Sequence, residues 1–156
     1  MHDERGDLGP MCDWPHVQAV TGVEAVLTQL RPHWRFALAT NARDSAEGQI
    51  WRALARVGLD RYFGRVFCYR GLGLRKQDRR FWLTVLEHLE LAPEEVVMVG
   101  DDFAGDVLAP NTAGLAAVWF NPSSKVRRVK PGWHCTIGHM RELPAALARL
   151  QAGRGQ

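Results

Sequence analysis

The stretch that decides the fold is VVMVGDDFAGD, residues 96–106. Its first four residues form a short, mostly β-branched apolar run, which predicts a buried strand. The run ends in a glycine and three carboxylates, at the carboxyl end of a strand, where open α/β sheets hold their ligands. Acids this close repel one another unless a cation neutralises them, and hard oxygen ligands suit Mg²⁺. The stretch therefore predicts either a magnesium site or a solvated acidic loop in which an aspartate caps the following helix.

Two further polar segments precede this stretch. The apolar run 36–39 ends in Thr40 and Asn41, whose hydroxyl and amide can hydrogen-bond a phosphate oxygen. The segment GLGLRKQD, residues 71–78, presents Lys76 just before a helical pattern, where its ammonium group can act on a phosphate as a point charge. These residues predict a phosphate site, although Thr40 as a cap of its strand and Lys76 as a solvated charge are the alternative interpretations.

The ordered set of these segments resembles the haloacid dehalogenase (HAD) superfamily of hydrolases over roughly residues 20 to 123. Thr40 resembles the second motif of the family, and Lys76 resembles its third. Asp101 and Asp106 resemble its fourth motif, in the form Gly-Asp-x-x-x-x-Asp. The ordered set of three motifs is specific, whereas each motif alone is too short to indicate a family.

The resemblance implies a Mg²⁺-dependent phosphomonoester phosphatase that forms an aspartyl-phosphate, which water then hydrolyses. By this resemblance, Lys76 would stabilise the transition state, and Thr40 with the Asn41 amide would hold a phosphoryl oxygen. Asp101 and Asp106 would hold Mg²⁺, directly or through water. Lys76 and Thr40 are therefore the expected catalytic residues of this chain.

The chain departs from the family pattern at several places. Asp102, a third candidate metal ligand, lies where the family varies, and a surface carboxylate is the alternative interpretation. Gln77 replaces the usual proline after the lysine. The first motif, a strand ending in Asp-x-Asp-Gly-Thr that supplies the nucleophile, is missing, because no apolar run precedes Asp3, Asp7 or Asp13. We therefore expect the chain as written to be inactive, and the alternative is a non-catalytic HAD-like protein that binds phosphate or metal for regulation.

The missing motif predicts a gap in the sheet. In the family, the first-motif strand lies between the second-motif and fourth-motif strands, and its loss leaves backbone groups unpaired at about 1–3 kcal/mol each when buried. The two halves could pair directly, another chain could donate a strand, or the native protein could start upstream. The expected partners are a homodimer or a strand-donating protein, and a small phosphorylated substrate whose identity depends on a cap domain that is mostly missing here.

Alternating strand and helix patterns predict an α/β fold, a Rossmann-like parallel sheet with helices on both faces. The expected strands cover 35–39, 65–68, 96–99, 117–120 and 134–137, and the expected helices cover 21–30, 44–57, 78–89, 105–113 and 142–151. Thr21 opens a capping-box pattern, Gly58 marks a helix end, and Asp78 caps the next helix. Pro110 fits its helix only if that helix begins near Asp106.

Length and composition fit one domain, with 156 residues of which 46% are apolar. We interpret residues 1–20 as an irregular N-terminal segment, a remnant of the cap region, and residues 21–152 as the HAD-like core. The net charge is +3, and the basic clusters at 70–80 and 125–130 fit solvated faces. The first of these clusters would also attract an anionic substrate. Aromatic residues do not interleave with these clusters as single-strand binders require, so a nucleic-acid partner is not expected.

Cysteine use and hydropathy predict the compartment. Cys12, Cys68 and Cys135 form no C-x-x-C pair, so we expect free thiols in a reducing environment. The N-terminus is charged, and no apolar run approaches the roughly 20 residues of a membrane span. These features predict a cytoplasmic location and no membrane partner.

Overall fold

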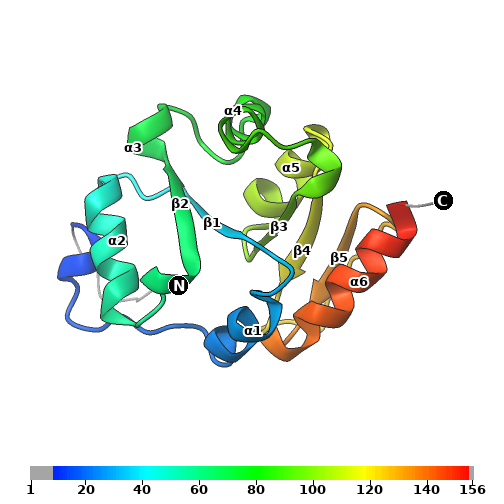
Figure 1. Ribbon diagram of the computed structural model, residues 1–156, viewed down its shortest axis with the longest axis horizontal. Helices are drawn as coiled ribbons and strands as arrows, with labels where there is room; N and C mark the ends of the chain where they lie inside the picture. The colour runs from blue at the N-terminus through cyan, green and yellow to red at the C-terminus, as the bar shows by residue number, and fades with distance from the viewer. Residues whose placement is uncertain (1–8, 155–156) are drawn as a thin grey trace.

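The computed structural model describes residues 9–154 as an α/β structure in which strands alternate with helices (Figure 1). The strands are β1 (Phe36–Thr40), β2 (Phe63–Cys68), β3 (Val97–Gly100), β4 (Ala116–Phe120) and β5 (His134–Ile137). They form one sheet of order β1-β2 and a second of order β3-β4-β5, and every pairing between these strands is parallel. The prediction of a parallel α/β fold is confirmed.

Helices cover both faces of these sheets. The α-helices are α1 (Val23–Leu30), α2 (Glu47–Arg56), α3 (Tyr69–Leu72), α4 (Arg79–Leu89), α5 (Ala109–Thr112) and α6 (Leu143–Arg154). Side chains of α1 and α6 pack with β4 and β5 into one apolar cluster, where Val118 and Ile137 are fully buried. Side chains of α4 and α5 pack with Phe67 and Leu115 into a second cluster, so the molecule has two apolar layers.

Several shorter helical turns connect these elements. They are 3₁₀ turns at Met11–Asp13, Asp60–Tyr62, Pro93–Glu95 and Met140–Glu142, and a π-helical segment at Phe103–Leu108. None of the helices between residues 9 and 154 combines the length and the apolar character needed to cross a membrane. The short helix α3 is the one α-helix that the sequence pattern did not predict, and it directly follows β2.

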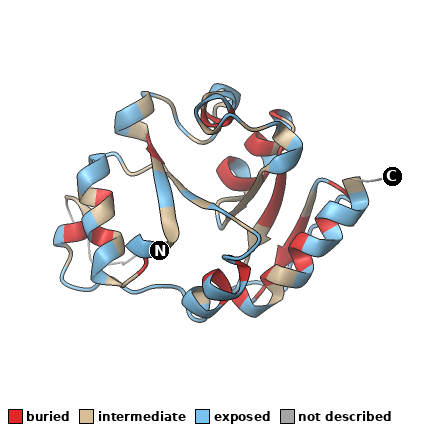
Figure 2. Cartoon of the chain, viewed as in Figure 1, coloured by how far each residue is buried: buried red, intermediate tan, exposed pale blue. Residues whose placement is uncertain are grey.

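The two sheets are separate. Among the described residues, β1 pairs only with β2, and β3 pairs only with β4. A cavity of about 450 Å³ lies between them, lined by residues of β1, β3 and α4. The predicted gap is therefore present, and the two halves have not closed it by direct pairing. Figure 2 shows its effect on burial, because β4 is mostly buried whereas β1 and β3 are intermediate or exposed throughout.

The start of α1 corrects one prediction. The N-cap is Gly22, whose φ of 80° is left-handed, and no side chain caps the helix. Thr21 therefore stands outside the helix, and the predicted capping box is wrong. Glu24 instead forms an ion pair with Arg61. Glycine suits this position because it has no Cβ, whereas the Cβ of another residue would crowd the backbone at a left-handed φ.

Two other predicted helix signals are confirmed. Gly58 follows α2 with a left-handed φ of 71°. Asp78 caps α4, because its side chain accepts a hydrogen bond from the backbone N–H of Arg80 at 2.9 Å. The sequence predicts these helix ends because each depends only on the residue at that position and its immediate neighbours.

The helix after β3 also differs from its prediction. It begins at Phe103, with Asp102 as its N-cap, and its first six residues are π-helical. The backbone N–H of Ala109 bonds the carbonyl of Ala104, five residues back, and α5 with Pro110 in its first turn follows directly. The wide π turns place Pro110 where the backbone changes its bonding pattern, so the proline is tolerated although the helix does not begin near Asp106.

The N-terminal segment is only partly described, since residues 1–8 lie outside the described part. The remainder includes one 3₁₀ turn and docks on α2, where the Arg56 guanidinium donates to the backbone carbonyl of Cys12 at 2.8 Å. Its assignment as a remnant of a cap region remains a prediction. The three cysteines are buried and free, as expected.

Candidate functional site

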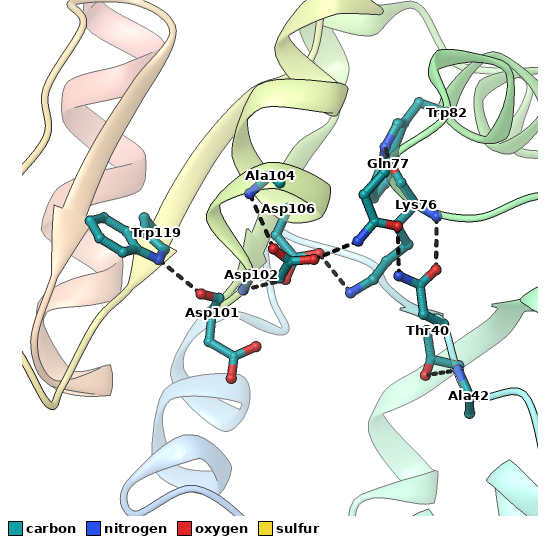
Figure 3. Close-up of polar contacts among 11 residues, drawn as sticks. Thr40, Ala42, Lys76, Gln77, Trp82, Asp101, Asp102, Ala104, Asp106 and Trp119 are labelled. Carbon is teal, nitrogen blue, oxygen red and sulfur yellow. Dashed lines mark hydrogen bonds and ion pairs between the residues drawn. The ribbon is translucent and has the colours of Figure 1, made fainter. Parts of the chain in front are cut away.

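A buried ion pair lies at the carboxyl edge of the strands. The Lys76 ammonium Nζ and the Asp106 carboxylate Oδ1 are 2.6 Å apart, and the side chains are 12% and 2% exposed. Lys76 comes from the loop before α4, and Asp106 comes from the π-helical segment after β3 (Figure 3). Burial raises the pKa of Asp106 above its ordinary value of 3.8, against the opposing effect of Lys76. The pair is therefore a largely buried charge pair that bridges two elements distant in sequence.

Two glycines allow Asp106 and Asp102 to fold back on the strand end. A Cβ at Gly100 would lie 2.2 Å from Asp106 Oδ2, and a Cβ at Gly105 would lie 2.7 Å from Asp102 Oδ2. Asp106 Oδ2 also accepts a hydrogen bond from the Asp102 backbone N–H at 3.1 Å. The two glycines thus allow a carboxylate to lie close to the backbone, which the composition of the stretch does not show.

Asp102 has the capping role that was one of the two interpretations of the acidic loop. Its Oδ1 accepts from the Ala104 backbone N–H at 3.1 Å, at the start of the π-helical segment. Its Oδ2 accepts from the Gln77 side-chain amide at 2.7 Å. Both oxygens of Asp102 are therefore engaged by the protein itself.

Asn41 and Gln77 continue this polar chain to β1. Asn41 Oδ1 accepts from the Lys76 backbone N–H at 2.8 Å, and its Nδ2 donates to Gln77 Oε1 at 2.9 Å. Gln77 thus links the end of β1 to Asp102 after β3, across the space between the two sheets (Figure 3). The sequence shows Gln77 only as a residue that replaces the family's usual proline. Its side-chain amide, next to the lysine, was the one signal of its bridging role.

Thr40 lies at the same edge. Its hydroxyl Oγ1 accepts a hydrogen bond from the Ala42 backbone N–H at 3.1 Å, which tightens the turn after β1. This is the capping interpretation of Thr40, and it leaves the hydroxyl hydrogen available for a further acceptor. Thr40 and Lys76 are brought to one edge by Asn41, which holds the lysine loop beside the end of β1.

Two tryptophans hold the loops of the site. Trp82 of α4 is 2% exposed, and its indole N–H donates to the Lys76 carbonyl at 2.7 Å. The indole N–H of Trp119 in β4 donates to the Asp101 carbonyl at 2.9 Å. The sequence does not reveal these two bonds, because the position of a tryptophan in an apolar pattern does not show where the polar end of its indole lies.

Asp101 is placed differently from the other two aspartates. It directly follows β3, but Figure 3 shows its carboxylate directed away from that of Asp106. Within residues 9–154, no group of three or more His, Cys, Asp or Glu side chains is close enough together to hold a metal ion. The donor set of carboxylate oxygens fits Mg²⁺ by its chemistry. Holding an ion between Asp101 and Asp106 would require the Asp101 side chain to turn toward the ion pair.

An aromatic group flanks the acidic loop. The Phe103 and Trp119 rings are 4.9 Å apart, and the Arg128 guanidinium carbon lies 4.4 Å from the Phe103 ring centre. His134 Nδ1 lies 2.9 Å from Asn111 Oδ1 and its ring contacts Phe103 edge-on. Burial lowers the pKa of His134 below 6.5, with a smaller effect of nearby cations. One residue of the second basic cluster therefore stacks beside the site.

Comparison with known proteins agrees with this arrangement. The sequence matches the haloacid dehalogenase-like hydrolase family over residues 13–114. It is 30% identical to the phosphoserine phosphatase of Thermus thermophilus, over 77% of this chain and 47% of that protein. It is also 30% identical to the N-acylneuraminate-9-phosphatase of Mus musculus, over 86% of this chain and 54% of that protein. The chain thus spans about half the length of these two curated relatives.

A solved structure extends the comparison to the fold. The crystal structure of an uncharacterized protein from Listeria monocytogenes serotype 4b superposes with a TM-score of 0.82 at 24% identity, over 95% of this chain and 89% of that one. The family match covers well over half of the chain and includes Thr40, Lys76, Asp101 and Asp106. On these grounds the chain belongs to the haloacid dehalogenase-like hydrolase family.

Proposed function

We propose that the carboxyl edge of the sheets is the phosphate- and Mg²⁺-binding part of a phosphomonoester phosphatase of the HAD type. The observation that carries the proposal is the ion pair of Lys76 and Asp106, which is nearly buried yet lies beside the end of β1. Two curated relatives named as phosphatases support the reaction class. The substrate is accordingly a small phosphorylated molecule.

Each residue has a role that its position allows. The Lys76 ammonium group offsets the charge of Asp106 and would hold a phosphoryl oxygen as a point charge. The Thr40 hydroxyl would donate to a second phosphoryl oxygen, since its Oγ1 is used only as an acceptor in the turn. Asn41 fixes the spacing between them, because both ends of its amide bind the lysine loop.

The metal would be held by Asp101 and Asp106. Bound Mg²⁺ neutralises phosphate charge and so favours attack on phosphorus. Asp102 is the weaker ligand, because both its oxygens already accept hydrogen bonds within the protein. Lys76 already contacts the Asp106 carboxylate, so we expect the metal and the lysine to share that carboxylate.

Hydrolysis also requires a nucleophile. No Asp-x-Asp follows an apolar run in this sequence, and we propose that the chain as written binds phosphate and metal without turnover. The alternative, a non-catalytic HAD-like protein that binds phosphate or metal for regulation, is favoured by the same observation. Grafting the first-motif segment of an active HAD phosphatase ahead of residue 9 separates the two, because hydrolysis in the graft supports the phosphatase and binding without hydrolysis supports the alternative.

Calorimetric titration tests the binding site. Wild-type protein is titrated with inorganic phosphate in the presence of Mg²⁺, and with Mg²⁺ alone. Lys76→Met and Thr40→Val should each weaken phosphate binding at least about tenfold, and Asp101→Asn should weaken Mg²⁺ binding. Lys125→Met, which removes an exposed lysine, is the matched control and should leave both affinities unchanged. Absence of binding by wild-type protein, or equal loss in the control, would contradict the proposal.

A turnover assay tests the second part. With p-nitrophenyl phosphate and Mg²⁺, turnover should stay below roughly 10⁻³ s⁻¹, far under typical enzymes. Faster Mg²⁺-dependent turnover that Asp101→Asn abolishes would refute the proposed inactivity. The same result would identify the residues of this edge as an active phosphatase site.

A further inference from the structure

One arginine of the second basic cluster has its backbone held by a buried residue of the sheet. Arg128 lies in the irregular segment between β4 and β5, and its side chain is exposed. The Thr136 hydroxyl of β5 accepts a hydrogen bond from the Arg128 backbone N–H at 2.8 Å and donates one to the Arg128 carbonyl at 2.9 Å. Thr136 is only 8% exposed, so the position of Arg128 along the segment is fixed from the sheet.

The segment is also bonded on each side of this arginine. After it, the Lys130 backbone N–H donates to the His134 carbonyl at 2.8 Å, and the His134 backbone N–H donates to the Lys130 carbonyl at 2.9 Å. Before it, the Asn121 side-chain amide donates to the Val126 carbonyl at 3.2 Å. A side chain on a segment held in this way loses less conformational entropy when it binds a ligand, because its backbone is already ordered.

The Arg128 guanidinium lies over two aromatic rings. Its central carbon is 4.4 Å from the ring centre of Phe103 and 5.9 Å from that of Trp119, and both rings are partly exposed. A cation over a ring is attracted by the charge distribution of the ring, which uses none of the five guanidinium N–H donors in a hydrogen bond. Within residues 9–154, these donors form no hydrogen bond or ion pair. The donors are therefore available to an anion.

The same two rings border the acidic loop of the candidate site. Phe103 is the first residue of the π-helical segment that follows this loop, and the Trp119 indole N–H donates to the Asp101 carbonyl at 2.9 Å. Figure 3 shows Trp119 and Lys76 on opposite sides of the loop. A molecule with its phosphate at Lys76 would therefore meet Arg128 on the far side of the loop.

We propose that Arg128 is a specificity-determining residue that binds a second anionic group of the phosphorylated substrate. This inference rests on the proposed function, because the phosphate of the same molecule occupies the edge at Lys76. The second group is a carboxylate or a second phosphate, since both accept the paired hydrogen bonds that a planar guanidinium donates. The substrate class is accordingly a small phosphorylated acid, whereas the phosphate ester of a neutral alcohol or sugar lacks the group that Arg128 binds.

Titration calorimetry with stable substrate analogues tests the proposal, at one fixed concentration of free Mg²⁺. The probes are phosphonocarboxylates of increasing chain length, bisphosphonates with one phosphonate at each end of the same chains, and alkylphosphonates that lack the second anion. In the wild-type protein, the second anion should tighten binding at least about tenfold once the chain is long enough to reach both cations. The series with the larger gain identifies the second group as a carboxylate or a phosphate.

Matched variants separate recognition of an anion from stacking on the rings. Arg128→Gln should remove the gain from the second anion and leave the affinity for alkylphosphonates unchanged, whereas Arg128→Lys keeps the charge and should retain part of the gain. Thr136→Val leaves the arginine in place but frees its backbone, so it should lower the gain several-fold. Arg35→Gln is the control, because Arg35 is exposed and precedes β1, at the opposite end of that strand from Thr40.

The outcomes distinguish this inference from the proposed function. If neither phosphate nor alkylphosphonates bind, the proposed function is contradicted and this inference falls with it. If alkylphosphonates bind and a second anion adds no affinity, this inference alone is overturned. A gain that survives in Arg128→Gln, or that Arg35→Gln removes equally, also overturns it. So does an equal loss of one-anion and two-anion ligands in Arg128→Gln, because that is the result expected of a purely structural arginine.

Discussion

β4 and β1 have the same length and a mostly apolar composition but different surroundings. Both are five-residue apolar strands, yet β4 buries its first three residues while β1 buries none. The difference comes from neighbours, because β4 is bonded on both sides and β1 on one. Local sequence therefore determines that a strand forms, and the number of paired edges determines how much stability each side chain contributes.

The largest expected difference is in the cost of core truncation. Ile137 in β5 is fully buried, whereas Leu38 in β1 is partly exposed beside the cavity. Ile137→Ala should lower the free energy of unfolding by about 2–5 kcal/mol, and Leu38→Ala by roughly 1 kcal/mol, because less contact is lost there. Urea denaturation measures both. Equal losses would show that β1 is as well packed as the three-stranded sheet.

The ion pair joins the two regions, so breaking it tests their connection. Lys76→Met leaves the Asp106 carboxylate buried without its partner and should cost about 3 kcal/mol. Adding Asp106→Asn should recover part of this loss, since the unpaired charge is then gone. Lys125→Met is the control and should change stability little. A double variant as unstable as the sum of the single variants would show that the two groups do not interact.

Gln77 provides a second link, with a smaller effect. Gln77→Ala removes hydrogen bonds to Asn41 and Asp102 and should cost about 1 kcal/mol, since both partners then turn to solvent. It should also speed amide exchange around Asn41, which would lose one of its two contacts with the lysine loop. Gln18→Ala, at an exposed position, should do neither. Unchanged exchange near Asn41 would mean that its bond with the Lys76 backbone N–H is sufficient to hold Asn41 in place.

The smallest expected effect is a pH dependence from the three-stranded region. Because His134 in β5 has a lowered pKa when folded, the folded state binds fewer protons than the unfolded state between that pKa and 6.5. Stability should therefore rise with pH across this interval and be lost as the pH falls through it. His134→Gln should flatten the difference in denaturation midpoint between about pH 5 and pH 7. An unchanged slope would assign the titration to other groups.

The sequence predicted the features that depend on residues close together in the chain, namely the strands and several helix ends. Every predicted strand exists, with shifts of one or two residues at the ends, and Asp78 and Gly58 act at helix ends as expected. Lys76 and Asp106 were singled out separately, and the fold brings them into contact. The gap between β1 and β3 was also predicted, from the motif that the sequence lacks.

The missed features depend on contacts distant in sequence or on backbone geometry. Gln77 bridges residues 36 positions before it and 25 positions after it, which no local pattern shows. The π-helical turns after β3 arise where Asp106 folds back on Gly100, and Pro110 is accommodated by them. The capping box at Thr21 failed because Gly22 adopts a left-handed backbone. The sequence pattern predicted the strands, the helices and the site residues. Backbone geometry and contacts distant in sequence determined how these are arranged.

The inward-facing edges of β1 and β3 also bear on solubility. Exposed strand edges are templates for aggregation, and proteins commonly blunt them with charge or short strands. Here two of the four edges of the described sheets, those of β1 and β3, line one cavity, and α4 forms another of its walls. The protein is thus expected to stay dispersed while α4 is docked and to aggregate when that helix loosens. Aggregation on mild heating would then report on the docking of one helix before the sheets themselves unfold.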